Sequence, residues 1–81
     1  MSSQLHLHDP VALLEDLPTF HFETGEPLLL RRGQIGTVVM PFDDGVYEVE
    51  FADRDGRAYA LLPVAPDRLM LLRDSPESAA A

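Results

Sequence analysis

The sequence predicts a small all-β domain whose five short strands curl into a closed barrel. Three observations favour this fold class. β-Branched residues gather in one run, Ile35 to Met40, and such residues favour strands. Apolar and acidic residues then alternate from Tyr47 to Phe51, which is the period of a strand with one buried face. Finally, Asp44-Gly45 and Asp55-Gly56 separate the apolar runs, where Asp-Gly pairs predict hairpin turns.

The first strand is expected at Val11–Leu14. It follows Pro10, a residue type that opens or edges a strand because it lacks a backbone N–H. The segment from Leu17 to Pro27 contains prolines and a glycine among polar residues, so we expect an irregular loop. We expect Phe20 and Phe22 in this loop to fold back onto the core.

The middle of the chain predicts three successive strands. After a turn at Arg31–Gln34, the second strand runs over Ile35–Met40, where Gly36 indicates a bulge, a bend or a close backbone approach. The third strand, Val46–Phe51, and the fourth, Arg57–Leu62, are joined by the second Asp-Gly turn.

The third strand has the clearest assignment of its two faces. Tyr47, Val49 and Phe51 point to the core, and Glu48 and Glu50 point to solvent.

The end of the ordered chain predicts a curved, closed sheet. Pro63 closes the fourth strand, Ala65–Arg68 forms a 3₁₀-like turn, and Leu69–Leu72 is the fifth strand. Five short strands joined by tight turns form an open sandwich or a small closed barrel, and we favour closure because it leaves no long sheet edges. A bend at Gly36 and a tight turn before the last strand are what an SH3-like barrel needs. The expected organisation is a flexible lead-in at residues 1–8, the barrel at residues 9–73 and a disordered tail at residues 74–81.

Composition narrows the function. Eighty-one residues make one domain, and the absence of cysteine excludes disulfides and thiolate chemistry. Fourteen acidic residues against six basic ones, a net charge of −8, disfavour nucleic acid and anionic membranes as partners. No apolar run approaches the roughly 20 residues of a membrane span, and no secretory signal is recognised, so we expect a cytoplasmic protein. The charge is compatible with a basic protein partner, or serves solubility alone.

The histidines do not predict a metal site. His6 and His8 point the same way in an extended chain, with Asp9 adjacent and His21 as a further candidate ligand. Ligands on an unsupported tail lack the outer contacts that hold metal sites in place. We therefore expect no metal and no cofactor.

Catalysis is not expected either. The carboxylates at Asp43, Asp44, Asp53 and Asp55 lie in predicted turns, where such side chains bond to the backbone. No nucleophile motif or phosphate-binding glycine loop is present, and a barrel this small is filled by its own side chains. The aromatic residues could form a groove for proline-rich peptides, but core packing is favoured; these are Phe42, Tyr47, Phe51 and Tyr59.

Five segments together resemble the DUF4926 family: residues 11–18, 30–39, 47–51, 55–61 and 69–71. The resemblance implies a small SH3-like barrel found in bacteria, with no catalytic residues to transfer. Some relatives are thought to lie beside genes for toxin-like proteins, which implies an antitoxin or immunity role. The Thr19–Leu29 segment is longer here than in relatives.

Two binding functions follow from these observations. In the first, an acidic strand face and turn dock a basic, toxin-like protein through Glu48, Glu50, Asp53 and Asp55. In the second, the domain is a structural or assembly subunit of a larger enzyme complex and binds through the apolar run Leu28–Leu30. Both allow a homodimer.

Overall fold

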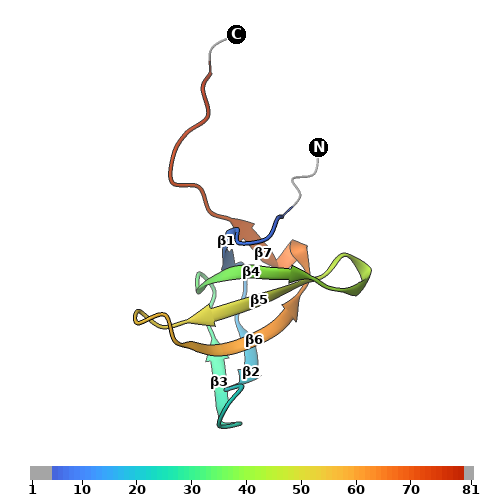
Figure 1. The fold of residues 1–81 in the computed structure, drawn as a ribbon, viewed down its shortest axis with the longest axis vertical. Coiled ribbons are helices and arrows are strands. Elements are labelled where there is room, and N and C mark those ends of the chain that lie inside the picture. The colour runs from blue at the N-terminus through green and yellow to red at the C-terminus, as the bar shows by residue number, and fades with distance from the viewer. Residues whose placement is uncertain (1–4, 80–81) are drawn as a thin grey trace.

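Seven strands in two sheets form the described part of the chain, residues 5–79, in the computed structural model (Figure 1). No α-helix occurs among these residues, so the predicted all-β class is confirmed. Two 3₁₀ turns, η1 (Asp43–Gly45) and η2 (Pro66–Arg68), precede β5 and β7. The strands are β1 (Pro10–Leu13), β2 (Leu17–Phe20), β3 (Pro27–Leu30), β4 (Ile35–Pro41), β5 (Tyr47–Ala52), β6 (Ala58–Val64) and β7 (Leu69–Leu71).

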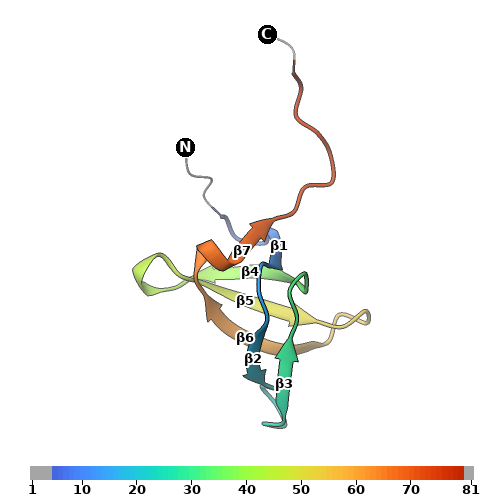
Figure 2. The same ribbon diagram turned by 180° about the vertical axis from the view of Figure 1, so that it is seen from behind.

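The larger sheet contains the five predicted strands, but it does not close into a barrel. Its antiparallel order is β6-β5-β4-β1-β7, with β6 and β7 at its two edges. The predicted closed barrel is therefore wrong. The β6 edge accepts one hydrogen bond from outside the sheet, because the backbone N–H of Phe22 donates to the Tyr59 carbonyl (3.1 Å). β7 has only three residues and pairs with β1. A second sheet, the β2–β3 hairpin, overlaps β6 and extends beyond it in both views (Figures 1 and 2).

The β2–β3 hairpin corrects the prediction of an irregular loop at Leu17–Pro27. The two strands are antiparallel, and the register pairs Leu17 with Leu30 and Phe20 with Pro27. Prolines are tolerated because each strand of a two-stranded sheet has an outer edge that needs no partner. The expected packing of Phe20 and Phe22 onto the core is also wrong, since their side chains are 65% and 50% exposed.

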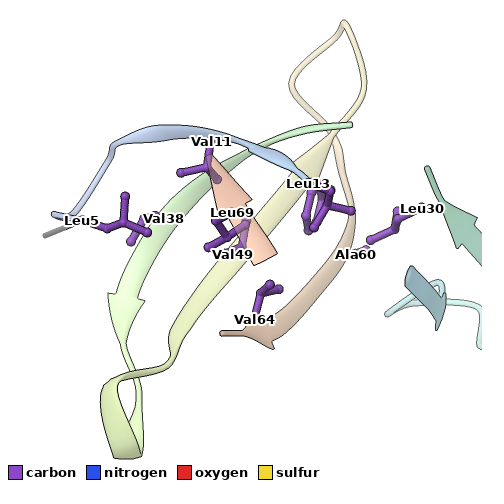
Figure 3. Packing of buried hydrophobic residues seen from close by; sticks show 10 residues of the cluster. Leu5, Val11, Leu13, Leu30, Val38, Val49, Ala60, Val64 and Leu69 are labelled. Atoms are coloured by element: carbon purple, nitrogen blue, oxygen red, sulfur yellow. The ribbon is translucent and has the colours of Figure 1, made fainter. Parts of the chain in front are cut away.

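The core lies on the concave side of the five-stranded sheet (Figure 3). The alternation predicted for β5 is confirmed, because Val49 and Phe51 are fully buried and Tyr47 packs against them. Gly36 marks a close approach: a Cβ placed there would lie 2.7 Å from Cγ1 of Val49. The register shift in β4 occurs further along, between Val38 and Met40. The buried hydrophobic residues are Leu5, Val11, Ala12, Leu13, Leu30, Val38, Val49, Phe51, Ala60, Val64 and Leu69.

The segment before β1 is packed against the sheet and is not the flexible lead-in expected at residues 1–8. Leu5 is buried in the core cluster. The backbone N–H of His8 donates to the Val38 carbonyl (2.6 Å), and Val38 N–H donates to the Asp9 carbonyl (2.9 Å). Residues 1–4 of this prediction lie outside the described residues.

Two predictions for the C-terminal half have different outcomes. Pro63 does not close the fourth strand, because β6 continues to Val64; the proline is accommodated on an edge strand. The turn before the last strand is confirmed as η2. Within the predicted tail, residues 74–79 are exposed and have no regular secondary structure. The remainder of the predicted tail, residues 80–81, lies outside the described residues.

Candidate functional site

Glu48 and Glu50 lie on the convex side of the five-stranded sheet. The register places Glu50 between Thr37 of β4 and Leu61 of β6. Glu48 lies in the same way between Met40 and Pro63. Both glutamates are half-buried, and neither has an ion pair or side-chain hydrogen bond among residues 5–79. The two carboxylates are therefore held beside uncharged neighbours with no internal cation.

The surroundings of this glutamate pair are apolar and exposed. Ile35 of β4 lies on the same side of the sheet as the glutamates and is 62% exposed. Ala12 of β1 pairs with Ile35 on one side and with Met70 of β7 on the other, and Met70 is 50% exposed. We call this surface the outer sheet face; it comprises Ile35, Thr37, Met40, Glu48, Glu50, Leu61, Pro63 and Met70.

Asp53 and Asp55, the other two predicted binding residues, lie in the β5–β6 turn. Asp53 builds the turn, because its Oδ1 accepts hydrogen bonds from the N–H groups of Asp55 (2.9 Å) and Arg57 (3.0 Å). Asp55 is exposed, and the turn also carries exposed Arg54. The structure thus brings Glu48 and Glu50 together and separates them from a turn whose charge is mixed.

A second exposed surface covers one side of the β2–β3 hairpin. We call it the hairpin face, and it consists of Pro18, Phe20, Pro27 and Leu29. The register pairs Pro18 with Leu29 and Phe20 with Pro27, so all four side chains lie on the same side. All are exposed, including Leu29 at 54%. The sequence of these two strands has no regular alternation of polar and apolar residues, and their prolines favoured a loop, so no sequence signal identified this face.

The hairpin face corrects the predicted apolar surface at Leu28–Leu30. Of these three leucines, only Leu29 is exposed. Leu30 is 2% exposed and belongs to the core, and Leu28 is half-buried on the side of the hairpin that faces the sheet.

The base of the hairpin is held by Asp16. Its Oδ1 accepts hydrogen bonds from the backbone N–H of Arg32 (2.8 Å) and from Nε of Arg31 (3.3 Å). The bond from Arg32 is the main reason that the pKa of Asp16 lies below its ordinary value. The Arg31 guanidinium adds to this effect, and lost hydration partly opposes it.

Comparison with protein families places these surfaces in a known domain type. A family model described as a domain of unknown function, DUF4926, matches residues 7–77, which include both sheets. This chain belongs to the DUF4926 family. No curated protein and no solved structure matches it.

The histidines of this DUF4926 domain have local backbone contacts. Nδ1 of His21 accepts hydrogen bonds from the N–H groups of Glu23 (3.1 Å) and Thr24 (3.3 Å) at the hairpin tip. Nδ1 of His6 lies 3.7 Å from Oδ2 of Asp9. Within residues 5–79, no group of three or more His, Cys, Asp or Glu side chains gathers to hold a metal ion.

Most of the aromatic residues pack as the sequence favoured. Phe51 is buried, and Tyr47 and Tyr59 pack against the core cluster. The side-chain amide of Gln34 donates a hydrogen bond to the Tyr59 hydroxyl. Phe42 is 50% exposed next to η1, so these residues do not line a common groove.

No helix within the described DUF4926 domain is long and apolar enough to cross a membrane.

Proposed function

We propose that this DUF4926 domain is a non-catalytic, cytoplasmic module that binds a basic protein through its outer sheet face. The observation that carries the proposal is the pair Glu48 and Glu50, which lacks internal cations within residues 5–79 and lies on an exposed apolar surface. Solvated acidic residues usually stand among other polar groups. Here, the cross-strand neighbours of the two glutamates are a threonine, a proline, a leucine and a methionine.

This arrangement suits a partner that presents arginine or lysine among apolar side chains. A guanidinium placed between the two carboxylates would make charge-assisted hydrogen bonds. Contact of the partner with the apolar cross-strand neighbours Met40, Leu61 and Pro63 would remove water from around those bonds and strengthen them. The net charge of −8 would speed the approach of a basic partner and make its association sensitive to salt.

A basic, toxin-like protein is the partner class that we favour, with the domain acting as its antitoxin or immunity partner. Two features support this choice: the acidic charge of the chain and the gene neighbourhood that the family resemblance implies. Binding through two carboxylates and an apolar surround needs no catalytic group in this domain.

The test is binding of the full chain to the product of the adjoining gene, measured at about 50 mM and about 500 mM salt. The combined variant Glu48→Gln and Glu50→Gln keeps side-chain size and removes two charges. It should weaken binding about tenfold or more at low salt. The matched control, Asp67→Asn with Glu77→Gln, makes the same charge change at exposed positions outside the face and should bind nearly as the parent does.

Two outcomes would contradict this proposal. One is equal loss of binding in both double variants, which would assign the effect to net charge. The other is binding that ignores salt and the glutamates but is lost in Leu29→Glu, which would favour the alternative of an assembly subunit that binds through the hairpin face.

A further inference from the structure

Charge is distributed unevenly along the β2–β3 hairpin. Its tip carries Glu23 and Glu26, both exposed. Its base carries Arg31 and Arg32, also exposed, together with the single acidic residue Asp16. Arg31 remains 70% exposed although its Nε lies 3.3 Å from Asp16, and the Arg32 side chain has no ion pair among the described residues. The hairpin therefore has an acidic end and a basic end, with the uncharged hairpin face between them.

This pattern is complementary to itself when reversed. If two hairpin faces meet about a two-fold axis that lies in the contact plane and runs perpendicular to the strands, the strands of the copies run in opposite directions. The tip of each hairpin then lies against the base of the other, so Glu23 and Glu26 face Arg31 and Arg32 twice. The apolar side chains Phe20 and Leu29 meet in the centre, away from water.

We propose that the hairpin face is the contact between two copies of this chain, packed face to face and antiparallel. A second copy is the occupant because the surface charge selects it. Most of the chain is acidic and repels another copy, with a net charge of −8. The hairpin tip carries two glutamates, and the two exposed arginines at the base outnumber Asp16, so an antiparallel approach places opposite charges together and offsets the repulsion.

The prolines favour contact through faces over contact through strand edges. β2 contains Pro18 and β3 contains Pro27. A proline has no N–H to donate to an added strand, and prolines are a common means of blocking edge-to-edge pairing. The side chains of the same two prolines belong to the exposed hairpin face, where they add apolar area to the proposed contact.

Sedimentation equilibrium of the full chain tests the dimer. The parent should show a monomer–dimer equilibrium, and Leu29→Glu should raise the dissociation constant at least about tenfold, because a carboxylate would be placed in the apolar centre. Phe42→Glu is the matched control, since Phe42 has similar exposure but lies outside both surfaces; it should dimerise as the parent does. A parent that stays monomeric at all accessible concentrations would overturn the proposal, as would equal dimerisation of Leu29→Glu.

A charge exchange tests the antiparallel arrangement. In the antiparallel dimer, Glu26→Arg places two cations opposite each other at positions 26 and 32, and Arg32→Glu places two anions there, so each variant alone should dimerise about tenfold more weakly. A mixture of the two should form a heterodimer of restored affinity, because residue 26 of each copy then faces a residue 32 of opposite charge. Failure of the mixture to associate more tightly than either variant alone would overturn the antiparallel contact. Since Glu48 and Glu50 are unchanged in these variants, binding of a basic partner is measured separately from the dimer.

Discussion

The ring of Phe51 fills the space where a side chain on Gly36 would lie. A Cβ at position 36 would be 2.8 Å from Cε1 of Phe51 and 2.9 Å from Cδ1. Phe51 is fully buried, so its ring has little room to move away. The absence of a side chain at Gly36 therefore lets β4 and β5 pack a large aromatic residue between them and the rest of the core.

Gly36→Ala should destabilise the fold by about 1–3 kcal/mol, the usual cost of adding volume to a packed core. A domain of this length has a net stability of about 4–12 kcal/mol, so the loss should be clear in a urea titration. Ile35→Ala is the neighbouring control: Ile35 is 62% exposed on the opposite side of β4, and its change should cost about 0.5 kcal/mol or less. A urea midpoint of Gly36→Ala equal to that of the parent would show that the core accommodates the added methyl group at little cost.

The sequence predicted the main sheet well because its strands carry strong local signals. The alternation from Tyr47 to Phe51 and the Asp-Gly turns depend only on neighbouring residues. The β2–β3 hairpin was missed because Pro18 and Pro27 read locally as strand breakers, and only the tertiary position of these strands makes prolines acceptable.

Closure and the candidate surfaces were harder to predict for a related reason. Whether β6 and β7 meet depends on where the hairpin packs, which no local pattern records. The side of β5 on which Glu48 and Glu50 lie could be predicted from alternation, whereas their apolar neighbours on β4 and β6 follow only from the register. Asp53 was assigned to the binding surface as well as to the turn, and its two backbone hydrogen bonds favour the turn.

Asp16 should make stability depend on pH. Because the pKa of Asp16 is lowered in the folded state, its ionised form stabilises the fold at pH values above the unfolded pKa of about 3.9, and this contribution is lost as the pH falls through the folded pKa. Asp16→Asn should therefore lower the urea midpoint at neutral pH, and the difference from the parent should shrink toward zero in strong acid. Asp74→Asn, at an exposed position beyond β7, serves as the control for general charge effects. A difference that stays constant from neutral pH to strong acid would contradict the role given to the Asp16 charge.

Asp53 should matter for folding and Asp55 should not. Asp53→Ala removes the oxygen that accepts two backbone N–H bonds and should cost about 1–2 kcal/mol in urea unfolding. Asp53→Asn keeps an acceptor oxygen and should retain most of the stability. Asp55→Ala should stay within about 0.5 kcal/mol of the parent, because Asp55 is exposed. Equal losses at both positions would indicate that the turn depends on charge and not on these two hydrogen bonds.

Leu5 should contribute to stability although it precedes the first strand. Its side chain is 8% exposed within the core cluster, whereas Leu7, two residues later, is 52% exposed. Leu5→Ala should cost about 2–3 kcal/mol, as expected for truncating a buried leucine, and Leu7→Ala should cost about 0.5 kcal/mol or less. The two variants make the same chemical change in the same segment, so their difference isolates burial of the side chain. If both variants have the urea midpoint of the parent, the segment before β1 contributes little to stability. That result would favour the flexible lead-in predicted from the sequence.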